Sequence, residues 1–203
     1  MPVWLIIVLV VAAIFLIVLL AIWGSYNGLV KLNERVEEAW SDITVQLKRR
    51  ADLIPNLVET VKGYAKHESD AIKQVSDARA KMMGARSVKE TAEADKSFMG
   101  ALSRIMAVSE SYPELKADAR YGQLISELTD TEDKVQAARR FYNAGVKDFN
   151  TKIKIFPTNV INSSFLHFEK RDYYEVDDEE AKRIDKAPEV NFSDKKEEKE
   201  DEK

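Results

Sequence analysis

The pattern of hydrophobic and polar positions begins with an apolar stretch at the N-terminus. Residues 3–23 contain no charge, no glycine and no proline. A helix of this length is about 31 Å long, which is enough to cross the hydrocarbon core of a bilayer. Trp4 and Trp23 lie near its two ends, where indole rings favour the membrane interface. The pattern therefore predicts a transmembrane anchor within residues 1–25.

A secretory signal is the alternative interpretation of this stretch. Such a signal needs a basic start and small residues before the cleavage point, whereas this chain starts with Met-Pro and reads LLAIWG over residues 19–24. We therefore expect an uncleaved span. The basic residues near the span all follow it: Lys31, Arg35, Lys48, Arg49 and Arg50. The positive-inside rule then predicts a cytoplasmic C-terminal body with the N-terminus outside.

After a break expected at residues 24–28, apolar residues recur every seven positions. One series is Leu29, Val36, Ile43 and Leu57, and the other is Trp40, Leu47, Ile54 and Val61. This spacing is typical of a helix that buries one seam. Arg50 falls in the first series, where a core residue is expected.

Three more amphipathic stretches follow, over about residues 71–84, 89–112 and 124–153. The last has the most regular seam, with steps of four and three like those of a coiled coil. No stretch alternates with a period of two. The predicted fold is therefore all-α: a single N-terminal transmembrane helix, then an antiparallel long-helix bundle of four helices over residues 26–176. Residues 158–174 are expected to form a short helix or turn across one end of the bundle.

Composition narrows the function. The chain has no cysteine and only two histidines, His67 and His167, so thiolate chemistry is excluded and most zinc sites are disfavoured. The net charge is −4, and the acidic excess lies in residues 177–203, which gives no sign of nucleic-acid binding. Every residue from 194 to 203 is charged, so we expect a disordered tail over 177–203. We expect neither a cofactor nor a metal.

Seven polar residues form the candidate site. They are Arg49, Arg50 and Asp52 on the first stretch, with Glu132, Arg139, Arg140 and Asn143 on the fourth. A buried arginine needs an acidic or carbonyl partner, because leaving it unpaired costs several kcal/mol. The set is interpreted either as an anion-binding or partner-binding site, or as an ion-pair network that fixes the register of the helices.

Three motifs accompany the apolar start. Residues 49–58 read RRADLIPNLV, residues 131–134 and 138–143 read TEDK and ARRFYN, and residues 156–159 read FPTN. Together they resemble the LemA family of bacterial membrane proteins over about residues 1–176. The resemblance implies a long-helix bundle behind one N-terminal span, with a small N-terminus outside the cell. It implies no catalytic residues, because the family has no settled biochemical activity.

The sequence favours a protein that is not an enzyme. We expect a protein-interaction or scaffold module at the bacterial inner membrane, which binds protein partners or itself. No nucleophile and base occur at a supporting spacing, and no glycine-rich phosphate loop is present. Two alternatives stay open: a regulatory or signal-transmission protein in which the bundle moves against the span, and an enzyme that uses Glu132, Arg139 and Arg140 on a phosphate or peptide substrate.

Overall fold

The computed structural model describes residues 2–175, and within that range it contains helices and no strand. The long helices are α1 (Val3–Tyr64), α2 (Ser69–Gly84), α3 (Val88–Ser111) and α5 (Ala119–Lys152). The short ones are α4 (Pro113–Lys116), α6 (Thr158–Ile161) and the π-helical turn η1 (Asn162–Leu166). The predicted all-α class with one long apolar N-terminal helix is confirmed. The predicted tail, residues 177–203, lies outside the described residues.

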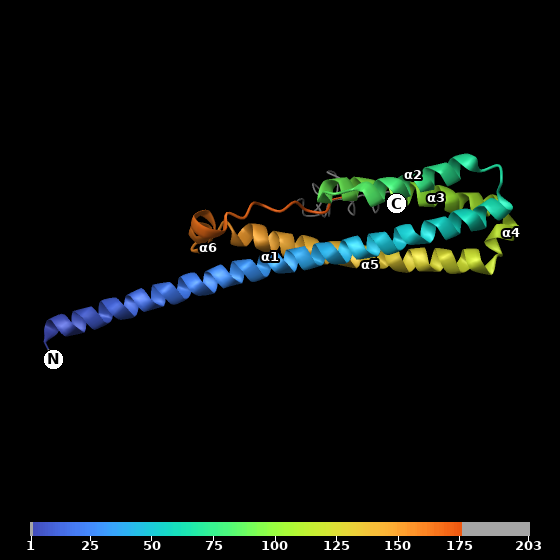
Figure 1. Ribbon diagram of the computed structural model, residues 1–203. Coiled ribbons are helices and arrows are strands. Elements are labelled where there is room, and N and C mark those ends of the chain that lie inside the picture. The colour runs from blue at the N-terminus through green and yellow to red at the C-terminus, as the bar shows by residue number, and fades with distance from the viewer. Residues whose placement is uncertain (1, 176–203) are drawn as a thin grey trace, which may run out of the picture.

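The helices run in alternating directions (Figure 1). α1 and α5 lie antiparallel as the main pair, and α2 and α3 form a hairpin that packs on α1. This hairpin covers only the part of the α1–α5 pair that is farther from the N-terminus. The structure therefore does not confirm the predicted bundle of four helices in this detail, although the long helices are antiparallel.

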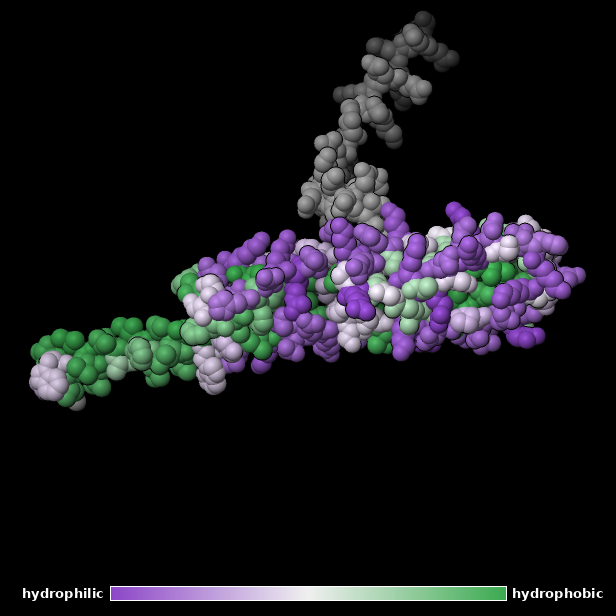
Figure 2. All heavy atoms as spheres, turned by 45° about the horizontal axis from the view of Figure 1, so that its top comes forward, coloured by the Kyte–Doolittle hydropathy of each residue, from purple (hydrophilic) through white to green (hydrophobic). Residues whose placement is uncertain are grey.

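α1 is one helix of 62 residues, about 93 Å long, so the predicted break at residues 24–28 is wrong. No glycine in the described part of the chain has a positive φ, and glycine inside a helix costs only about 1 kcal/mol. The helix that continues on both sides of residues 24–28 outweighs that cost. The apolar part of α1 is long and hydrophobic enough to cross a membrane and none of it is buried in the protein. It projects from the bundle as a hydrophobic rod (Figure 2).

Two substitutions test this continuity. Gly28→Ala should stabilise α1 by about 0.5–1 kcal/mol, because no neighbouring atom lies within 4 Å of the place a Cβ would take. Gly28→Pro should cost about 3 kcal/mol or more, because proline removes a helical hydrogen bond and clashes with the preceding turn. Thermal unfolding of the full chain in detergent, followed by circular dichroism, measures both. A lower midpoint for Gly28→Ala would contradict a continuous helix.

The heptad seam of α1 forms the centre of the core. Leu29, Ile43 and Leu57 are fully buried, and Val36 nearly so. Gly145 of α5 brings the two long helices close together, because a Cβ there would lie 3.4 Å from Val36 Cγ2. The sequence pattern therefore identified the buried face of α1 correctly.

Side chains at two helix starts fix where the chain turns. Ser87 and Glu90 bond each other's backbone N–H groups at the start of α3. The Asp118 carboxylate accepts bonds from two N–H groups in the first turn of α5. The Tyr64 hydroxyl at the end of α1 donates to the same carboxylate over 2.7 Å, and this bond lowers the pKa of Asp118. The end of α1 is thus tied to the start of its antiparallel partner.

The last described residues form two parts. Residues 155–166, here called the tip, contain α6 and η1 and lie at the end of the bundle where the apolar part of α1 leaves it (Figure 1). His167, with a φ of 51°, ends η1 in a left-handed conformation. Residues 167–175, here called the strap, then run back along the bundle without regular secondary structure. The expected short helix across one end describes the tip, whereas the sequence did not predict the strap.

Candidate functional site

The centre of the candidate site is Arg50, which the heptad register of α1 turns into the core. Its side chain is fully buried. One guanidinium nitrogen, Nη2, pairs with Asp95 of α3, and Nη1 pairs with Glu132 of α5. The guanidinium also lies 5.0 Å from the centre of the Phe98 ring. One cation from α1 thus holds two helices that otherwise contact each other little.

The partners of Arg50 are joined to each other by further contacts. Glu132 accepts a bond from Gln136 Nε2 over 2.6 Å, and Gln136 Oε1 accepts one from Arg139 over 3.3 Å. The Arg139 guanidinium lies 4.9 Å from the centre of the Tyr174 ring. The Tyr174 hydroxyl donates to Asp95 Oδ2 over 2.9 Å. We call this closed cycle the polar ring: Arg50, Asp95, Glu132, Gln136, Arg139 and Tyr174.

The structure brings together some of the predicted site residues and separates others. Arg50, Glu132 and Arg139 belong to the polar ring, and Asn143 lies beside it, bound to the backbone of Tyr174. Arg49, Asp52 and Arg140 are exposed. The carboxylate of Asp52 lies 4.0 Å from Arg79 of α2 rather than near the ring.

Sequence reasoning missed three members of the polar ring: Asp95, Gln136 and Tyr174. Asp95 had a signal: it lies three residues before Phe98 and four after Thr91, and all three are buried on one face of α3. A charge in a seam of α3 is the natural complement of a charge in the seam of α1. Tyr174 had no such signal, because the strap has no helical period that shows which residues face inward.

Asparagines of α5 hold the strap through its backbone. Asn143 accepts from the Tyr174 N–H over 2.8 Å and donates to the Tyr174 carbonyl over 3.0 Å. Asn150 forms the same pair of bonds with Arg171, each over 2.9 Å. Seven helical residues rise about 10.5 Å, and three extended residues span about 10 Å. The two spacings match, so one helix face can bind every third residue of the strap.

The strap is also tied to α1. The Arg171 guanidinium donates to Asn33 Oδ1 over 2.9 Å and pairs with Glu37 over 2.6 Å. The ring of Trp40 packs on Tyr174, with ring centres 6.3 Å apart. The strap therefore closes over the α1–α5 pair, in the region that the α2–α3 hairpin leaves uncovered.

Burial changes the acidity of two tyrosines at this place. Burial, followed by the charge of Asp95, raises the pKa of Tyr174 above its ordinary value. Burial raises the pKa of Tyr142 to about 12, and its hydroxyl donates to the Asp172 carbonyl over 2.9 Å. Both phenols therefore stay neutral and act as hydrogen-bond donors in the folded protein.

The shift of Tyr142 predicts a dependence of stability on alkaline pH. A raised pKa means that folding favours the neutral phenol, so this stabilisation is complete below pH 10 and is lost as the pH rises from 10.0 to about 12. Tyr142→Phe should flatten the fall in stability over that window. Urea unfolding at a series of pH values measures it. Comparing the unmodified chain with Tyr142→Phe near pH 7 isolates the effect of the lost bond to Asp172. If Tyr142→Phe loses stability with rising pH as steeply as the unmodified chain, the prediction is contradicted.

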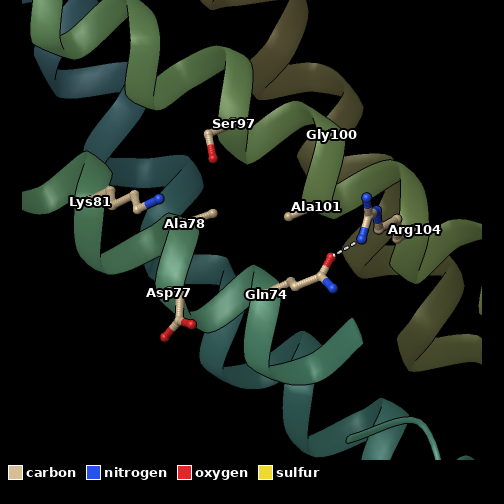
Figure 3. Close-up of a pocket in the computed structure, with 8 residues that line it drawn as sticks. All are labelled: Gln74, Asp77, Ala78, Lys81, Ser97, Gly100, Ala101 and Arg104. Atoms are coloured by element: carbon tan, nitrogen blue, oxygen red, sulfur yellow. Dashed lines mark hydrogen bonds between the residues drawn. The ribbon is translucent and has the colours of Figure 1, made fainter. Parts of the chain in front are cut away.

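A hollow of about 300 Å³ lies between α2 and α3, away from the polar ring. In Figure 3 Ala78 and Ala101 face each other across it, and a hydrogen bond from Arg104 to Gln74 closes one side. Asp77 points away from the hollow. Within residues 2–175, no three histidine or acidic side chains gather into a group suited to a metal ion.

Comparison with known proteins identifies the family. A model described as LemA family matches residues 39–192, which leaves out the apolar start. Magnetosome protein MamQ 2 of Paramagnetospirillum magneticum is 26% identical over 176 residues, covering 74% of this chain and 64% of the relative. Protein LemA of Metamycoplasma hominis is 27% identical over 165 residues, covering 81% of this chain and 73% of the relative. The chain thus spans just under two thirds of the length of the MamQ relative. In agreement with the resemblance seen in its motifs, the chain belongs to the LemA family.

Proposed function

We propose that the protein is anchored in the bacterial inner membrane by one span, residues 3–23, and that its helical body is a protein-interaction or scaffold module in the cytoplasm. The observation that carries this proposal is α1, a single helix that is apolar and uncovered over its first part and becomes the core of the body beyond Leu29. The anchor and the body are therefore one mechanical unit. The LemA and MamQ relatives support a membrane-associated role.

An interaction role is favoured over an enzymatic one by where the charges lie. Arg50 and Asp95 form an ion pair in the core, and the other terminal nitrogen of Arg50 pairs with Glu132. Two of the three residues of the enzymatic alternative are engaged within the protein: Glu132 is bound to Arg50 and Gln136, and the Arg139 guanidinium lies on the Tyr174 ring. We infer that the polar ring fixes the register of α1, α3 and α5, the role that is best attested for buried ion pairs. The exposed faces of the helices are then the surfaces left for partners.

The interaction role is tested by cross-linking in intact cells. A photoreactive amino acid is placed at Val45 on α1 or at Phe141 on α5, two hydrophobic residues that are more than half exposed. We expect protein cross-links at one or both positions, identified by mass spectrometry. The matched control is Thr129, an exposed polar position on α5, which should give fewer. Absence of any protein cross-link, together with a monomeric mass in mild detergent, would contradict the interaction role.

Orientation is tested separately. The chain has no cysteine, so Ser111→Cys at the exposed end of α3 introduces one reactive thiol. A maleimide that cannot cross membranes should modify it only after the cells are permeabilised. Modification in intact cells would place the body outside and overturn the cytoplasmic assignment.

Signal transmission is the second candidate, and the continuity of α1 favours it. A rotation or shift of the span would pass through residues 24–28, which are helical, to the polar ring around Arg50. Since this segment is already helical, breaking it is more informative than locking it. If the candidate is right, Gly28→Pro should uncouple the body from the span and change the cellular phenotype, whereas Gly28→Ala should not. Equal phenotypes would count against it.

A further inference from the structure

The tip has one buried face and one exposed hydrophobic face. Thr158 and Ile161 are buried against the end of the bundle, and α6 contacts α1 there. On the outer side, Phe156 is 80% exposed, and the other exposed members are Ile155 (46%), Val160 (53%) and Phe165 (67%). Four large hydrophobic side chains are thus exposed within eleven residues.

The rest of the body is different. Between residues 29 and 154, the exposed large hydrophobic residues are Val45, Tyr64, Met83, Met106 and Phe141, scattered singly over four helices. Single exposed hydrophobic residues are normal, whereas a cluster marks a surface that contacts something apolar. Among the described residues from 29 to 175, such a cluster occurs in the tip.

The position of the tip shows what covers it. α1 enters the bundle as a single helix, and the tip lies at the end of the bundle beside its apolar part (Figure 1). With residues 3–23 in the membrane, as proposed above, this end of the bundle faces the bilayer. After Trp23, α1 first becomes partly covered at Ser25 and fully buried at Leu29. Six helical residues rise about 9 Å, and the headgroup layer is about 5–8 Å thick on each side of the hydrocarbon. The tip therefore lies at the level of the headgroups. Figure 2 shows the hydrophobic surface of α1 continuing onto this end of the body.

The charges of the tip fit a lipid surface. From Thr151 to Phe168 there is no acidic residue, and the charged side chains are Lys152 and Lys154. Phenylalanines inserted at the acyl boundary with lysines at the headgroups are the usual composition of segments that bind anionic bilayers at the interface.

We propose that the tip is a second membrane contact: Ile155, Phe156, Val160 and Phe165 insert into the interface of the anionic leaflet from which α1 emerges. This inference rests on the proposed anchoring by α1 and adds to it. One span lets a body rotate and tilt, whereas a span and an inserted tip together fix the orientation of the body on the membrane.

The test uses the full chain, labelled with a nitroxide at one introduced cysteine and reconstituted in vesicles of phosphatidylcholine and phosphatidylglycerol. The labelled positions are Ser164→Cys in the tip, Ser111→Cys at the far end of α3 and Ala13→Cys inside the span, all exposed on the protein. Collision with oxygen and with a water-soluble nickel complex reports depth. We expect the label at 13 in the hydrocarbon, the label at 164 at the interface and the label at 111 in water.

A double substitution then tests the side chains. Phe156→Ser with Phe165→Ser should raise the nickel accessibility of the label at 164 several-fold, to that of the label at 111, and leave the label at 13 unchanged. The control is Phe141→Ser, an exposed phenylalanine of α5, which should move no label. If the double substitution leaves the label at 164 immersed, insertion by these phenylalanines is overturned.

The other outcomes distinguish failure of the tip contact from failure of the anchor. A label at 164 in water with the label at 13 immersed overturns the tip contact and leaves the anchor intact. A label at 13 in water overturns the anchor itself. A label at 164 shielded from nickel, with strong spin coupling between chains, assigns the hydrophobic face to a second copy and overturns the lipid contact.

Discussion

Replacing Arg50 by methionine should destabilise the body by about 3–5 kcal/mol, the range measured when one partner of a buried ion pair is removed. Methionine fills similar space, but it leaves Asp95 and Glu132 without their shared cation. A change of this size lowers the unfolding midpoint of a chain of this length by about 6–20 °C. Near-ultraviolet circular dichroism of the full chain in detergent reports the loss of aromatic packing.

Two variants separate the ion pair from general disturbance of α1. Arg49→Met changes the exposed neighbour of Arg50 and should shift stability by no more than about 0.5 kcal/mol. Adding Asp95→Asn and Glu132→Gln to Arg50→Met removes the unpaired charges and should recover part of the loss. A single Arg50→Met variant as stable as the unmodified chain would show that the polar ring does not hold the helices together.

Replacing Tyr174 by alanine should release the strap. The ring is almost fully buried, and removing a buried aromatic side chain costs about 3–5 kcal/mol. The strap is the last described segment, so we expect it to open locally while α1 and α5 stay folded. Hydrogen exchange read by mass spectrometry should show loss of protection over residues 167–175.

The controls for the strap lie beside Tyr174. Tyr174→Phe keeps the ring and removes only the hydroxyl bond to Asp95, so the expected cost is about 1–3 kcal/mol. Asp172→Ala removes an exposed side chain from the same segment and should leave exchange unchanged. If Tyr174→Ala exchanges no faster than Asp172→Ala, the Tyr174 side chain does not hold the strap, and its backbone bonds to α5 and the Arg171 contacts with α1 suffice.

The ion pairs of Arg50 and the hydrogen bonds of Asn143 and Asn150 have different positions in the fold. Arg50 joins α1 to α3 and α5, so it holds together elements that are distant in sequence. Asn143 and Asn150 hold an extended segment on one helix. Tyr174 belongs to both groups, because its backbone binds Asn143 and its hydroxyl binds Asp95. We therefore expect partial coupling between the Arg50 and Tyr174 substitutions in a double-mutant cycle.

The sequence by itself determined the apolar span, the all-α class and the buried face of α1. These features depend on hydrophobic periodicity, which is a local property that a single chain displays in full. It also showed that Arg50 lies in a seam, and hence that an acidic partner was needed. Glu132 was recognised as part of the polar set because it lies seven residues before Arg139, on the same face of the fourth stretch.

Only the tertiary structure decided which partner each polar residue has. Asp95 lies 45 positions after Arg50, and Tyr174 lies 79 positions after Asp95. No periodic rule links residues that are so far apart along the chain. The helical continuity of residues 24–28 depended on the helix on both sides outweighing the cost of two glycines, which composition alone does not show. The strap was decided by a match between the rise of α5 and the length of an extended segment. Packing likewise decided that the tip lies beside the end of the apolar part of α1, the position on which the proposed membrane contact depends.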